Sequence, residues 1–436
     1  MATNKVRDLI AKEKKRQDET LMMIPSENYT YPEVREAVGS ILMHKYAEGD
    51  PGRRYYQGNE FVDQIESLCE DLALRAFGLD SDKWHANVQP HSGCEANLAV
   101  YHAFLEKNDK IMSMYLPDGG HLSHGWFMGE KRITLVSKLF DIEFYHVEAD
   151  TKTFDYDKIA KQARKVKPKM IITGGTAYPR EIDYKEMAEV AKSVGAIYLA
   201  DIAHEAGLIA AGVMDSPFPH ADVVTMTTHK TLRGPRGAVI ITKKRFGERI
   251  DRAIIPGLQG GPHIHSIAGI AVALDKTETI EFRKYAANTI KNAKTLASEL
   301  QKYDFDVVSG GTDKHLVLVD LRNKGANGWF IAWALEYAGI VTNRNTVPYD
   351  TGSPFYPSGL RLGTPALTVR GMGVAEMKLI AGWINEAVEA VGKRELPKHK
   401  EERLKYLRDF KQKMQNHKKL SEIAEKVKKL CKKYPI

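Results

Sequence analysis

The chain has 436 residues, of which 43% are hydrophobic, and a formal net charge of +8. That length favours two or three domains, and that composition is ordinary for a soluble globular protein. No stretch reaches the roughly 18 apolar residues of a membrane span, and the charged segment 1–20 lacks the apolar core of a secretory signal. We therefore expect a cytoplasmic protein and exclude a membrane partner.

The positive charge is concentrated at the carboxyl end. Residues 393–436 contain 16 Lys and Arg against 6 Asp and Glu, so this segment holds +10 and the remaining residues hold −2. Its apolar residues recur at steps of three and four, as on amphipathic helices; they are Leu404, Leu407, Phe410, Met414, Leu420, Ile423, Ala424, Val427 and Leu430. We predict two helices docked on the body of the protein, and a patch for RNA or a membrane surface is the alternative.

The three cysteines do not indicate a disulfide framework. Cys69, Cys94 and Cys431 are widely spaced and match neither paired half-cystines nor a zinc motif. We expect reduced thiols and predict no metal site.

The first element with a chemical signal begins at Ser92-Gly93, a glycine turn that opens a helix. A helix start presents free backbone N–H groups and a positive dipole end, which suit an anion such as a phosphate. Ser-Gly before a helix is equally a capping device. A second glycine loop, residues 256–262, has three glycines in five residues. It permits close approach of a ligand to the backbone or is simply a turn.

Strand and helix signals alternate in the next part of the chain. Residues 170–175 predict a buried strand that ends in turn residues, and Tyr184 to Val194 predicts a helix with Gly195 as its carboxyl cap. The next strand, residues 197–200, leads to Asp201. This order of strand, helix and strand implies right-handed crossovers and a mainly parallel sheet.

Asp201, His204 and Lys230 follow two of the predicted strands. Asp201 and His204 come after the run 197–200, and Lys230 comes after the run 223–227. If both runs are parallel strands of one sheet, the three side chains emerge at its carboxyl edge, where open α/β sheets bind ligands. A lysine amine forms a Schiff base with an aldehyde, and a carboxylate holds a pyridine nitrogen protonated. The trio therefore suits pyridoxal phosphate, although each residue taken singly is more often structural.

A second domain is predicted after a helix at residues 264–277. It begins with a long polar helix, residues 281–303, followed by strands around residues 306–308 and 315–320 and by helices up to Val391. The continued alternation of helix and strand predicts a smaller α/β domain that closes one side of a cleft.

Together, these motifs resemble the serine hydroxymethyltransferases, a family of fold-type I pyridoxal phosphate enzymes. The matching segments are 25–29 (PSENY), 45–49 (KYAEG), 54–56 (RYY), 89–93 (QPHSG), 119–122 (GGHL), 201–207 (DIAHEAG), 227–232 (TTHKTL), 259–262 (QGGP), 309–313 (SGGTD) and 361–366 (RLGTPA). The resemblance implies an α/β fold with a mainly parallel seven-stranded sheet flanked by helices. It also implies four parts: an amino-terminal arm (1–45), a large cofactor-binding domain (46–277), a small carboxyl-terminal α/β domain (278–392) and a basic helical extension (393–436).

For the cofactor, the resemblance implies that Lys230 forms the Schiff base, Asp201 holds the pyridinium and His121 stacks on the ring. His204 is expected near the cofactor's phenolic oxygen or the substrate, and Thr227 near the Schiff base. Further cofactor contacts are implied for Tyr46, Ser92, Gly93, Cys94 and Thr176, and for Gly261, which would reach the phosphate of the neighbouring subunit. That last contact implies a homodimer with shared active sites.

For the substrates, the resemblance implies that the planar fork of Arg361 binds the amino-acid carboxylate. Ser26, Tyr46 and Tyr56 are expected to support the amino acid and the cofactor. Glu48 is expected to move a proton at the serine hydroxymethyl group or the pterin. The pterin end is assigned to Leu116, Gly120, Leu122, Asn345 and the loop Ser353-Pro354-Phe355, together with Glu48.

The implied activity is the reversible transfer of the serine hydroxymethyl carbon to a reduced pterin, which yields glycine and the methylene-pterin. The pterin is tetrahydrofolate or tetrahydromethanopterin, and the reaction belongs to one-carbon and amino-acid metabolism. An alternative on the same fold is a threonine or allo-threonine aldolase, which needs no pterin. A more distant alternative is an RNA-binding protein without catalysis that uses the basic extension.

Two departures from the family pattern concern the cofactor and the carrier. Cys94 and Glu95 stand where the family usually has serine and glutamine. A thiol is a weaker donor than a hydroxyl, and a carboxylate repels a phosphate unless it turns away or is paired, so the phosphate would rely on backbone amides. The basic extension has no counterpart in the common form of the family. A subgroup that carries it could use tetrahydromethanopterin, and the choice of carrier stays open.

Overall fold

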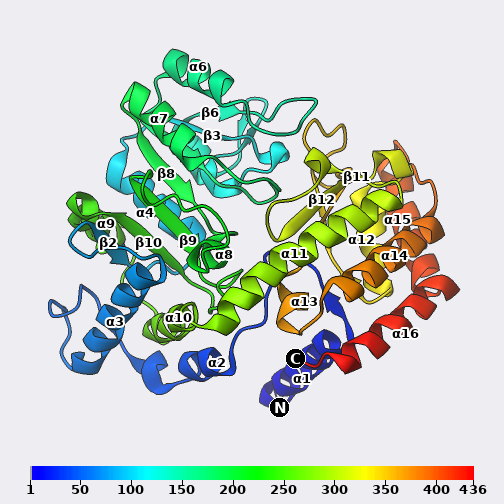
Figure 1. The fold of residues 1–436 in the computed structure, drawn as a ribbon, viewed down its shortest axis with the longest axis horizontal. Helices are drawn as coiled ribbons and strands as arrows, with labels where there is room; N and C mark the ends of the chain where they lie inside the picture. The colour runs from blue at the N-terminus through cyan, green and yellow to red at the C-terminus, as the bar shows by residue number, and fades with distance from the viewer. Residues whose placement is uncertain (1) are drawn as a thin grey trace. The chain divides into compact units, whose positions relative to one another are not determined.

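The computed structural model describes residues 2–436; Met1, the first residue of the predicted amino-terminal arm, lies outside the described residues. The chain folds into two compact units (Figure 1). We call residues 30–287 the central unit, and residues 2–29 together with 288–436 the terminal unit. The terminal unit is therefore built from both ends of the chain.

A seven-stranded sheet forms the middle of the central unit, in the order β2-β10-β9-β8-β7-β3-β6. Its strands are β2 (Trp84–Asn87), β3 (Lys110–Met114), β6 (Asp141–Tyr145), β7 (Met170–Thr173), β8 (Ile197–Asp201), β9 (Val223–Thr227) and β10 (Ala238–Lys243). β10 runs antiparallel to β2 and β9, and the five strands from β9 to β6 are parallel to one another. The prediction of a mainly parallel seven-stranded α/β sheet is confirmed.

Helices cover the sheet, so β7 and β9 are buried along their whole length, as is typical of parallel strands. The helices of the central unit are α2 (Pro32–Val38), α3 (Glu60–Ala76), α4 (Gly93–Phe104), α5 (Leu135–Leu139), α6 (Tyr156–Val166), α7 (Tyr184–Val194), α8 (Ala206–Ala210), α9 (Gly247–Ile254) and α10 (Ile264–Lys276). Shorter elements are the 3₁₀ turns η1 (Ile41–His44), η2 (Leu116–Asp118), η3 (Leu122–His124) and η4 (Lys244–Phe246) and the hairpin of β4 (Phe127–Met128) and β5 (Lys131–Arg132).

Two predicted helices have the ends that their sequences indicate. The side chain of Asp183 caps α7 by accepting a hydrogen bond from the Glu186 backbone N–H, and α7 ends at Gly195 with a φ of 70°, which favours glycine. α4 begins at Gly93, with Ser92 as its cap. Its apolar side packs into the core that lies against the sheet. The helix that was predicted to open at Ser92-Gly93 is therefore confirmed.

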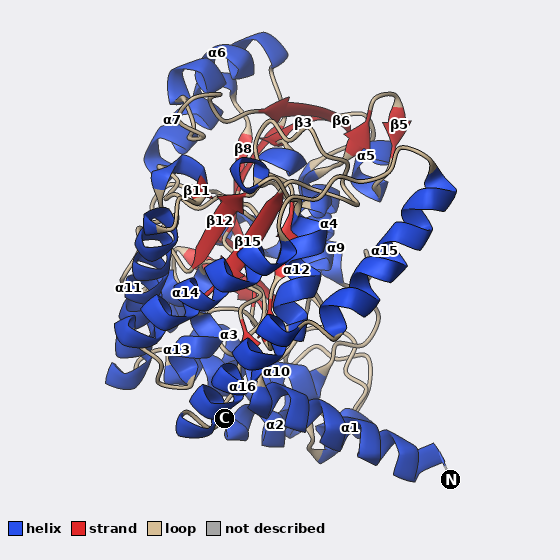
Figure 2. Cartoon of the chain, turned by 90° about the vertical axis from the view of Figure 1, so that its right-hand side faces the viewer, coloured by secondary structure: helices blue, strands red, loops and turns tan. Residues whose placement is uncertain are grey.

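The terminal unit contains a four-stranded antiparallel sheet in the order β11-β12-β15-β14. Its strands are β11 (Asp306–Val307), β12 (Leu316–Asp320), β15 (Gly359–Gly363) and β14 (Asn343–Asn345), and β12 and β15 lie side by side in Figure 2. A short parallel pair joins β1 (Leu21–Met22) to β13 (Ile340–Val341). This pair attaches the amino-terminal residues to the carboxyl-terminal part of the chain.

Helices complete the terminal unit and confirm a second α/β part of the fold. They are α1 (Ala2–Glu19), α12 (Gly328–Tyr337), α13 (Pro365–Val369), α14 (Val374–Val391), α15 (Lys400–Gln415) and α16 (Lys418–Lys433), with the 3₁₀ turns η5 (Val308–Gly310) and η6 (Arg322–Lys324). α11 (Ile280–Lys302) carries the chain from the central unit into the terminal unit.

The basic extension forms two docked helices, as predicted. One face of α15 and α16 is buried in the hydrophobic core of the terminal unit, through Leu407, Phe410, Met414, Leu420, Ile423, Val427 and Leu430. Leu404, at the start of α15, is 54% exposed. Arg370 joins the ends of α16 and α1, because its guanidinium donates to backbone carbonyls of Cys431, Tyr434, Gln17, Asp18 and Thr20.

The cysteines are free thiols; Cys69 and Cys431 are buried, and Cys94 is exposed. Among residues 2–436, no helix is both long and apolar enough to cross a membrane. Within the same residues, no group of three or more His, Cys, Asp or Glu side chains is arranged to hold a metal ion.

Candidate active site

Asp201 lies at the carboxyl end of β8 and is 8% exposed. Its Oδ2 accepts a hydrogen bond from Asn97 Nδ2 (2.8 Å) and lies 2.9 Å from His124 Nε2, and its Oδ1 accepts from the Ala203 backbone N–H (3.0 Å). Burial alone would raise the pKa of Asp201, but the His124 hydrogen bond and charge, with His121 and Asn97, hold this pKa well below its usual value. The carboxylate therefore stays ionised, and His124 donates to it.

The donors to Asp201 are themselves held in place. Thr225 Oγ1 on β9 donates to Asn97 Oδ1 (2.7 Å), which leaves Asn97 Nδ2 to donate to Ser123 Oγ (2.9 Å) and to Asp201. Thr225 is paired with Asp201 across β8 and β9, so the register of the sheet sets this network. Nδ1 of His124 is buried and has no hydrogen-bond partner among the described residues.

His121 stands at the start of η3, on the loop that also carries His124. Its Nδ1 accepts a hydrogen bond from the Ser123 backbone N–H (3.2 Å) and lies 2.7 Å from the Ser123 hydroxyl. With Nδ1 as an acceptor, the neutral imidazole carries its proton on Nε2. The half-buried ring lies 5.6 Å, between centroids, from that of His124. This short loop therefore presents two imidazoles on the Asp201 side of the unit.

Lys230 follows β9 in a tight turn. The Arg233 backbone N–H donates to the Lys230 carbonyl (3.1 Å), and that of Gly234 donates to the Thr228 carbonyl (2.7 Å). Lys230 itself is 8% exposed. Because β8 and β9 are adjacent and parallel, Asp201 and Lys230 leave the sheet at the same edge.

Cys94, on the first turn of α4, lies close enough to Asp201 and Lys230 for the charge of each to act on its thiol. Partial burial and the Asp201 carboxylate raise the pKa of the Cys94 thiol, whereas the Lys230 ammonium acts in the opposite direction. The start of α4, Asp201 and Lys230 therefore surround one region of the central unit.

Thr227 and His204 border the same region. Thr227 Oγ1 donates to the Ala203 carbonyl (3.0 Å), and the buried His204 accepts at its carbonyl from Thr231 Oγ1 (2.9 Å). A Cβ atom on Gly93 would lie 2.5 Å from Thr227 Cγ2. Only glycine therefore lets α4 begin so close to the end of β9.

The start of α4 has the features of an anion site. Ser92 Oγ accepts a hydrogen bond from the Glu95 backbone N–H (3.4 Å), and the 12-residue helix directs its positive dipole end to this point. The Glu95 carboxylate lies 3.5 Å from Nδ1 of His91. The Glu95 side chain therefore lies beside an imidazole.

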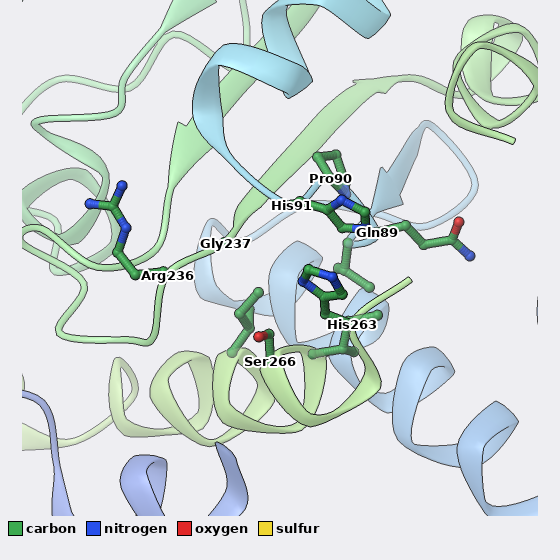
Figure 3. A pocket seen from close by; sticks show the side chains of 10 residues that line it. Gln89, Pro90, His91, Arg236, Gly237, His263 and Ser266 are labelled. Carbon is green, nitrogen blue, oxygen red and sulfur yellow. The ribbon is translucent and has the colours of Figure 1, made fainter. Parts of the chain in front are cut away.

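His91 also stacks on His263 beside a small pocket (Figure 3). The two rings are 7° from parallel, with centroids 3.9 Å apart. The pocket is lined by Val88, Gln89, Pro90, His91, Arg236, Gly237, His263, Ser266, Ile267 and Ile270. Partial burial and the neighbouring His91 lower the pKa of His263, so this stacked imidazole stays neutral at neutral pH.

Tyr46, Glu48, Tyr56 and Gly261 form a second group in the central unit. The Tyr46 hydroxyl donates to Glu48 Oε1 (3.1 Å), and the Tyr46 and Tyr56 rings meet edge to face with centroids 5.0 Å apart. A Cβ atom on Gly261 would lie 3.4 Å from the Tyr46 ring. Tyr46 is 54% exposed and Tyr56 is 40% exposed, so this group lies at an open face of the unit.

Thr176, Leu116, Gly120 and Leu122 lie on two loops that touch each other. The Thr176 backbone N–H donates to the Gly119 carbonyl (2.7 Å). Leu122 is 50% exposed, whereas Gly120 is buried and Leu116 is half-buried. These loops follow β3 and β7, two of the parallel strands, so they belong to the same edge of the sheet as Asp201.

Arg361 and Ser26 lie in the terminal unit. Arg361, on β15, is 6% exposed, and its Nε donates to Asn343 Oδ1 (3.1 Å) on the neighbouring β14. Burial lowers the pKa of Arg361 to about 10, so the guanidinium is still charged at neutral pH. The Gly363 backbone N–H donates to the Met23 carbonyl (2.7 Å). This hydrogen bond places the segment that contains Ser26 beside the end of β15.

The other residues assigned to the pterin also lie in the terminal unit. Asn345, on β14, donates from Nδ2 to the Thr346 carbonyl (2.7 Å). Ser353, Pro354 and Phe355 form an exposed loop, and Phe355 is 73% exposed. None of these contacts is specific to a pterin, so the assignment stays a prediction.

Comparison with known proteins decides the family. A family model described as serine hydroxymethyltransferase matches residues 1–384. The chain belongs to the serine hydroxymethyltransferase family. A serine hydroxymethyltransferase from Acidothermus cellulolyticus is 52% identical over 388 residues, which cover 89% of each chain. One from Methanosarcina barkeri is 48% identical over 430 residues (98% of this chain, 97% of the relative), and a mitochondrial one from Kluyveromyces lactis is 44% identical over 447 residues (98% and 89%).

These alignments bear on the basic extension. The family model ends at residue 384, before the extension begins. The M. barkeri and K. lactis serine hydroxymethyltransferases, however, align with 98% of the chain. Most of residues 393–436 therefore have a counterpart in both relatives, and the extension is shared by some members of the family.

The residues around Asp201 fit pyridoxal phosphate, the cofactor of serine hydroxymethyltransferases. An ionised carboxylate offers about four acceptor positions, and described residues fill three of them at Asp201. The position left on Oδ1 suits a protonated pyridine nitrogen. Lys230 leaves the sheet at the same edge and suits the aldehyde, and the start of α4 suits the phosphate.

Sequence reasoning did not identify Asn97 and His124 as parts of this site. It also did not identify His263, which stacks on His91 beside the small pocket. A signal existed for Asn97, since it lies among Ala96, Ala99 and Val100 on the buried side of α4. A lone amide among buried apolar residues is usually hydrogen-bonded inside the protein. His124 offered no comparable pattern, because a histidine in a short polar loop is unremarkable.

Proposed function

We propose that this protein catalyses the reversible transfer of the hydroxymethyl carbon of serine to a reduced pterin. Family membership supports the reaction. The observation that carries the proposal is the ionised Asp201 carboxylate, which three donors hold while one acceptor position remains, at the same edge of the sheet as Lys230. When bound, pyridoxal phosphate supplies an electron sink for the carbanion that loss of the carbon leaves on glycine.

In this proposal, Lys230 binds the aldehyde and Asp201 holds a proton on the pyridine nitrogen. Asp201 suits that task because its pKa is held low, its Oδ2 is held by Asn97 and His124, and its Oδ1 accepts from the Ala203 backbone N–H. His121 stacks on the ring and keeps a proton on Nε2, because Nδ1 accepts from the Ser123 backbone. His204 and Thr227 would lie beside the bound cofactor and the amino group of the substrate.

The phosphate is assigned to the start of α4, with Ser92, Gly93 and Cys94, and to Thr176. Backbone N–H groups carry most of this contact, because the Cys94 thiol is a weak donor. Gly261 would reach the phosphate of a second subunit, so we propose a homodimer with shared sites. The open face that bears Tyr46 and Tyr56 supports this assembly. A fully active monomer in analytical ultracentrifugation would contradict it.

Arg361 is assigned to the carboxylate of the amino acid, and Ser26 and Tyr56 support the same substrate. Arg361 remains cationic, and its burial strengthens the attraction for a carboxylate that enters its surroundings. Glu48 moves a proton at the serine hydroxyl or the pterin, and Tyr46 holds the Glu48 carboxyl group in place.

The pterin is assigned to Leu116, Gly120, Leu122, Asn345 and the loop Ser353-Pro354-Phe355, together with Glu48. The carrier is tetrahydrofolate or tetrahydromethanopterin. A cytoplasmic location is part of the proposal; the name of the K. lactis relative places that enzyme in mitochondria. Cell fractionation followed by immunoblotting tests the location.

The decisive experiment is an assay of serine cleavage by the pyridoxal phosphate-loaded protein with tetrahydrofolate, with tetrahydromethanopterin and without a pterin. We expect at least a severalfold acceleration by one of the carriers. Cleavage of threonine or allo-threonine that is indifferent to both carriers would favour an aldolase. A protein that takes up no cofactor would contradict the proposal and favour the RNA-binding alternative.

A further inference from the structure

A buried ion pair lies beneath the loop that carries Glu48. Glu66, on α3, is 0% exposed, and the Arg54 side chain is 3% exposed. Arg54 Nη2 lies 2.5 Å from Glu66 Oε2, and Arg54 Nε lies 2.8 Å from Asp63 Oδ1. Burying such a pair is costly unless further hydrogen bonds satisfy both partners. The other hydrogen bonds of Arg54 and Glu66 therefore show which segment the ion pair holds in place.

Arg54 holds the backbone on both sides of Glu48. Its Nη1 donates to the carbonyl of Ala47 (3.0 Å) and to the carbonyl of Gly49. The carbonyl of Glu48 itself accepts from the Tyr55 backbone N–H (2.9 Å). Three successive carbonyls around Glu48 are thus fixed by the segment that contains Arg54.

Glu66 orients a second donor to the same loop. Its Oε1 accepts from Gln89 Nε2 (2.5 Å), and this amide group also donates to the Gly49 carbonyl (3.1 Å). Each oxygen of Glu66 therefore faces a donor that also binds the Glu48 loop, Arg54 on one side and Gln89 on the other. Only an acceptor with two free oxygens satisfies both donors at once.

Among the hydrogen bonds of residues 2–436, the Glu48 side chain, by contrast, accepts a single one, from Tyr46. Hydrogen bonds from Arg54, Gln89 and Tyr55 thus hold the backbone of the loop. This arrangement sets the position of the Glu48 carboxyl group through the backbone that carries it.

We propose that Glu66 is a positioning residue for the transfer of the hydroxymethyl carbon, because through Arg54 and Gln89 it fixes the loop that places the Glu48 carboxyl group. The inference rests on the proposed function and on the role of Glu48 within it. Glu66 contacts neither substrate nor cofactor in this account. A misplacement of about 1 Å at a reacting group lowers a rate about 100-fold, so a small shift of the loop is enough.

The test is the substitution Glu66→Gln, which keeps the volume of the side chain and replaces one acceptor oxygen by an NH₂ group. Whichever way the new amide turns, Arg54 or Gln89 meets a donor. We expect kcat for pterin-dependent serine cleavage to fall about 10- to 100-fold. The KM for serine and the pterin-independent cleavage of a bulky β-hydroxy amino acid, such as phenylserine, should stay close to those of the wild type.

Glu70→Gln is the matched control, on the same helix and one turn further along. Burial and the neighbouring Glu66 raise the pKa of Glu70 to about 8, so this carboxyl group is mostly protonated at neutral pH and resembles an amide. Glu70 has no contact with Arg54 or Gln89 in the hydrogen bonds of the described residues. We expect both reactions of Glu70→Gln to match the wild type.

If Glu66→Gln does not fold, Gln89→Met is assayed in the same two reactions. We then expect a smaller loss of pterin-dependent serine cleavage, again with little change in phenylserine cleavage. Equal losses in both reactions, or no loss in either, would overturn the inference and leave the proposed function standing. A wild-type protein that shows no pterin-dependent cleavage would overturn the proposed function itself. The two failures are therefore distinguishable.

Discussion

Two carboxylates of the central unit are held in opposite ways. Asp201 is buried at the end of β8, and donors from α4, the η3 loop and the β8 loop fix both of its oxygens. Glu48 lies half-buried on a loop, and its carboxyl group accepts one hydrogen bond, from Tyr46. In the Glu48 loop it is the backbone that is fixed, through Arg54 and Gln89.

The difference corresponds to two chemical tasks. A group that keeps a ring nitrogen protonated has to stay ionised throughout a reaction, and hydrogen bonds to its charged form secure that state. A group that moves a proton has to change its charge, so many donors would hold it in one state and slow it. In the role proposed for Glu48, the fixed backbone sets the position of its carboxyl group.

The largest effect is expected at the fixed carboxylate. Asp201→Asn removes the charge that we propose keeps the pyridine nitrogen protonated, so serine cleavage with a pterin and phenylserine cleavage without one should both fall about 1000-fold or more. Steady-state kinetics of the cofactor-loaded variant measure this loss, and circular dichroism checks the fold. A variant that retains activity in both reactions would show that the Asp201 charge is not needed.

A selective effect is expected at the Glu48 carboxyl group. Glu48→Gln cannot transfer a proton, so pterin-dependent serine cleavage should fall about 100-fold, while phenylserine cleavage changes much less. The ratio of the two rates measures the selectivity. Equal losses in the two reactions would contradict the role that separates Glu48 from Asp201.

A third charged side chain extends the comparison to the terminal unit. Arg361 is buried and charged like Asp201, but it is assigned to the carboxylate of the amino acid. Its removal should therefore weaken the binding of serine rather than the transfer of a proton. We expect Arg361→Ala to raise the KM for serine about 30-fold or more. Arg322→Ala, which removes a partly exposed arginine of the same unit, is the control. An unchanged serine affinity in Arg361→Ala would remove this residue from the site.

The smallest effect concerns stability in acid. Folding lowers the pKa of Asp201 below its unfolded value, so its ionised form stabilises the fold above about pH 4, and this contribution is lost as the pH falls further. The urea midpoint of the cofactor-free wild type should therefore drop more steeply below about pH 4 than that of Asp201→Asn. Parallel curves for the two proteins would contradict the low pKa.

Much of the central unit could be predicted because its signals are local. The helix Tyr184–Val194 has a capping Asp183 before it and Gly195 after it, and both residues act where their chemistry predicts. Asp201 and Lys230 follow apolar strands, and parallel strands bring such ends to one edge. Local rules thus predict the fold and the shared edge of the sheet at which Asp201 and Lys230 lie.

What the sequence did not reveal depends on contacts between distant segments. Asp201 is separated in the chain by 104 positions from Asn97 and by 77 positions from His124. The sequence near His124 contains no pattern that predicts its contact with Asp201. Likewise, residues 2–29 join the terminal unit through β1 and β13, a pair of two residues each. A pair that short carries no periodic pattern, so sequence reasoning placed this segment in a separate arm.

The most direct test of the account is borohydride reduction of the protein after it is loaded with pyridoxal phosphate, followed by peptide mapping. We expect a visible absorbance that borohydride bleaches, and a covalent cofactor on the peptide that contains Lys230. We also expect that Asp201→Asn retains this label while losing activity. Label on another lysine, or no cofactor uptake at all, would contradict the central claim.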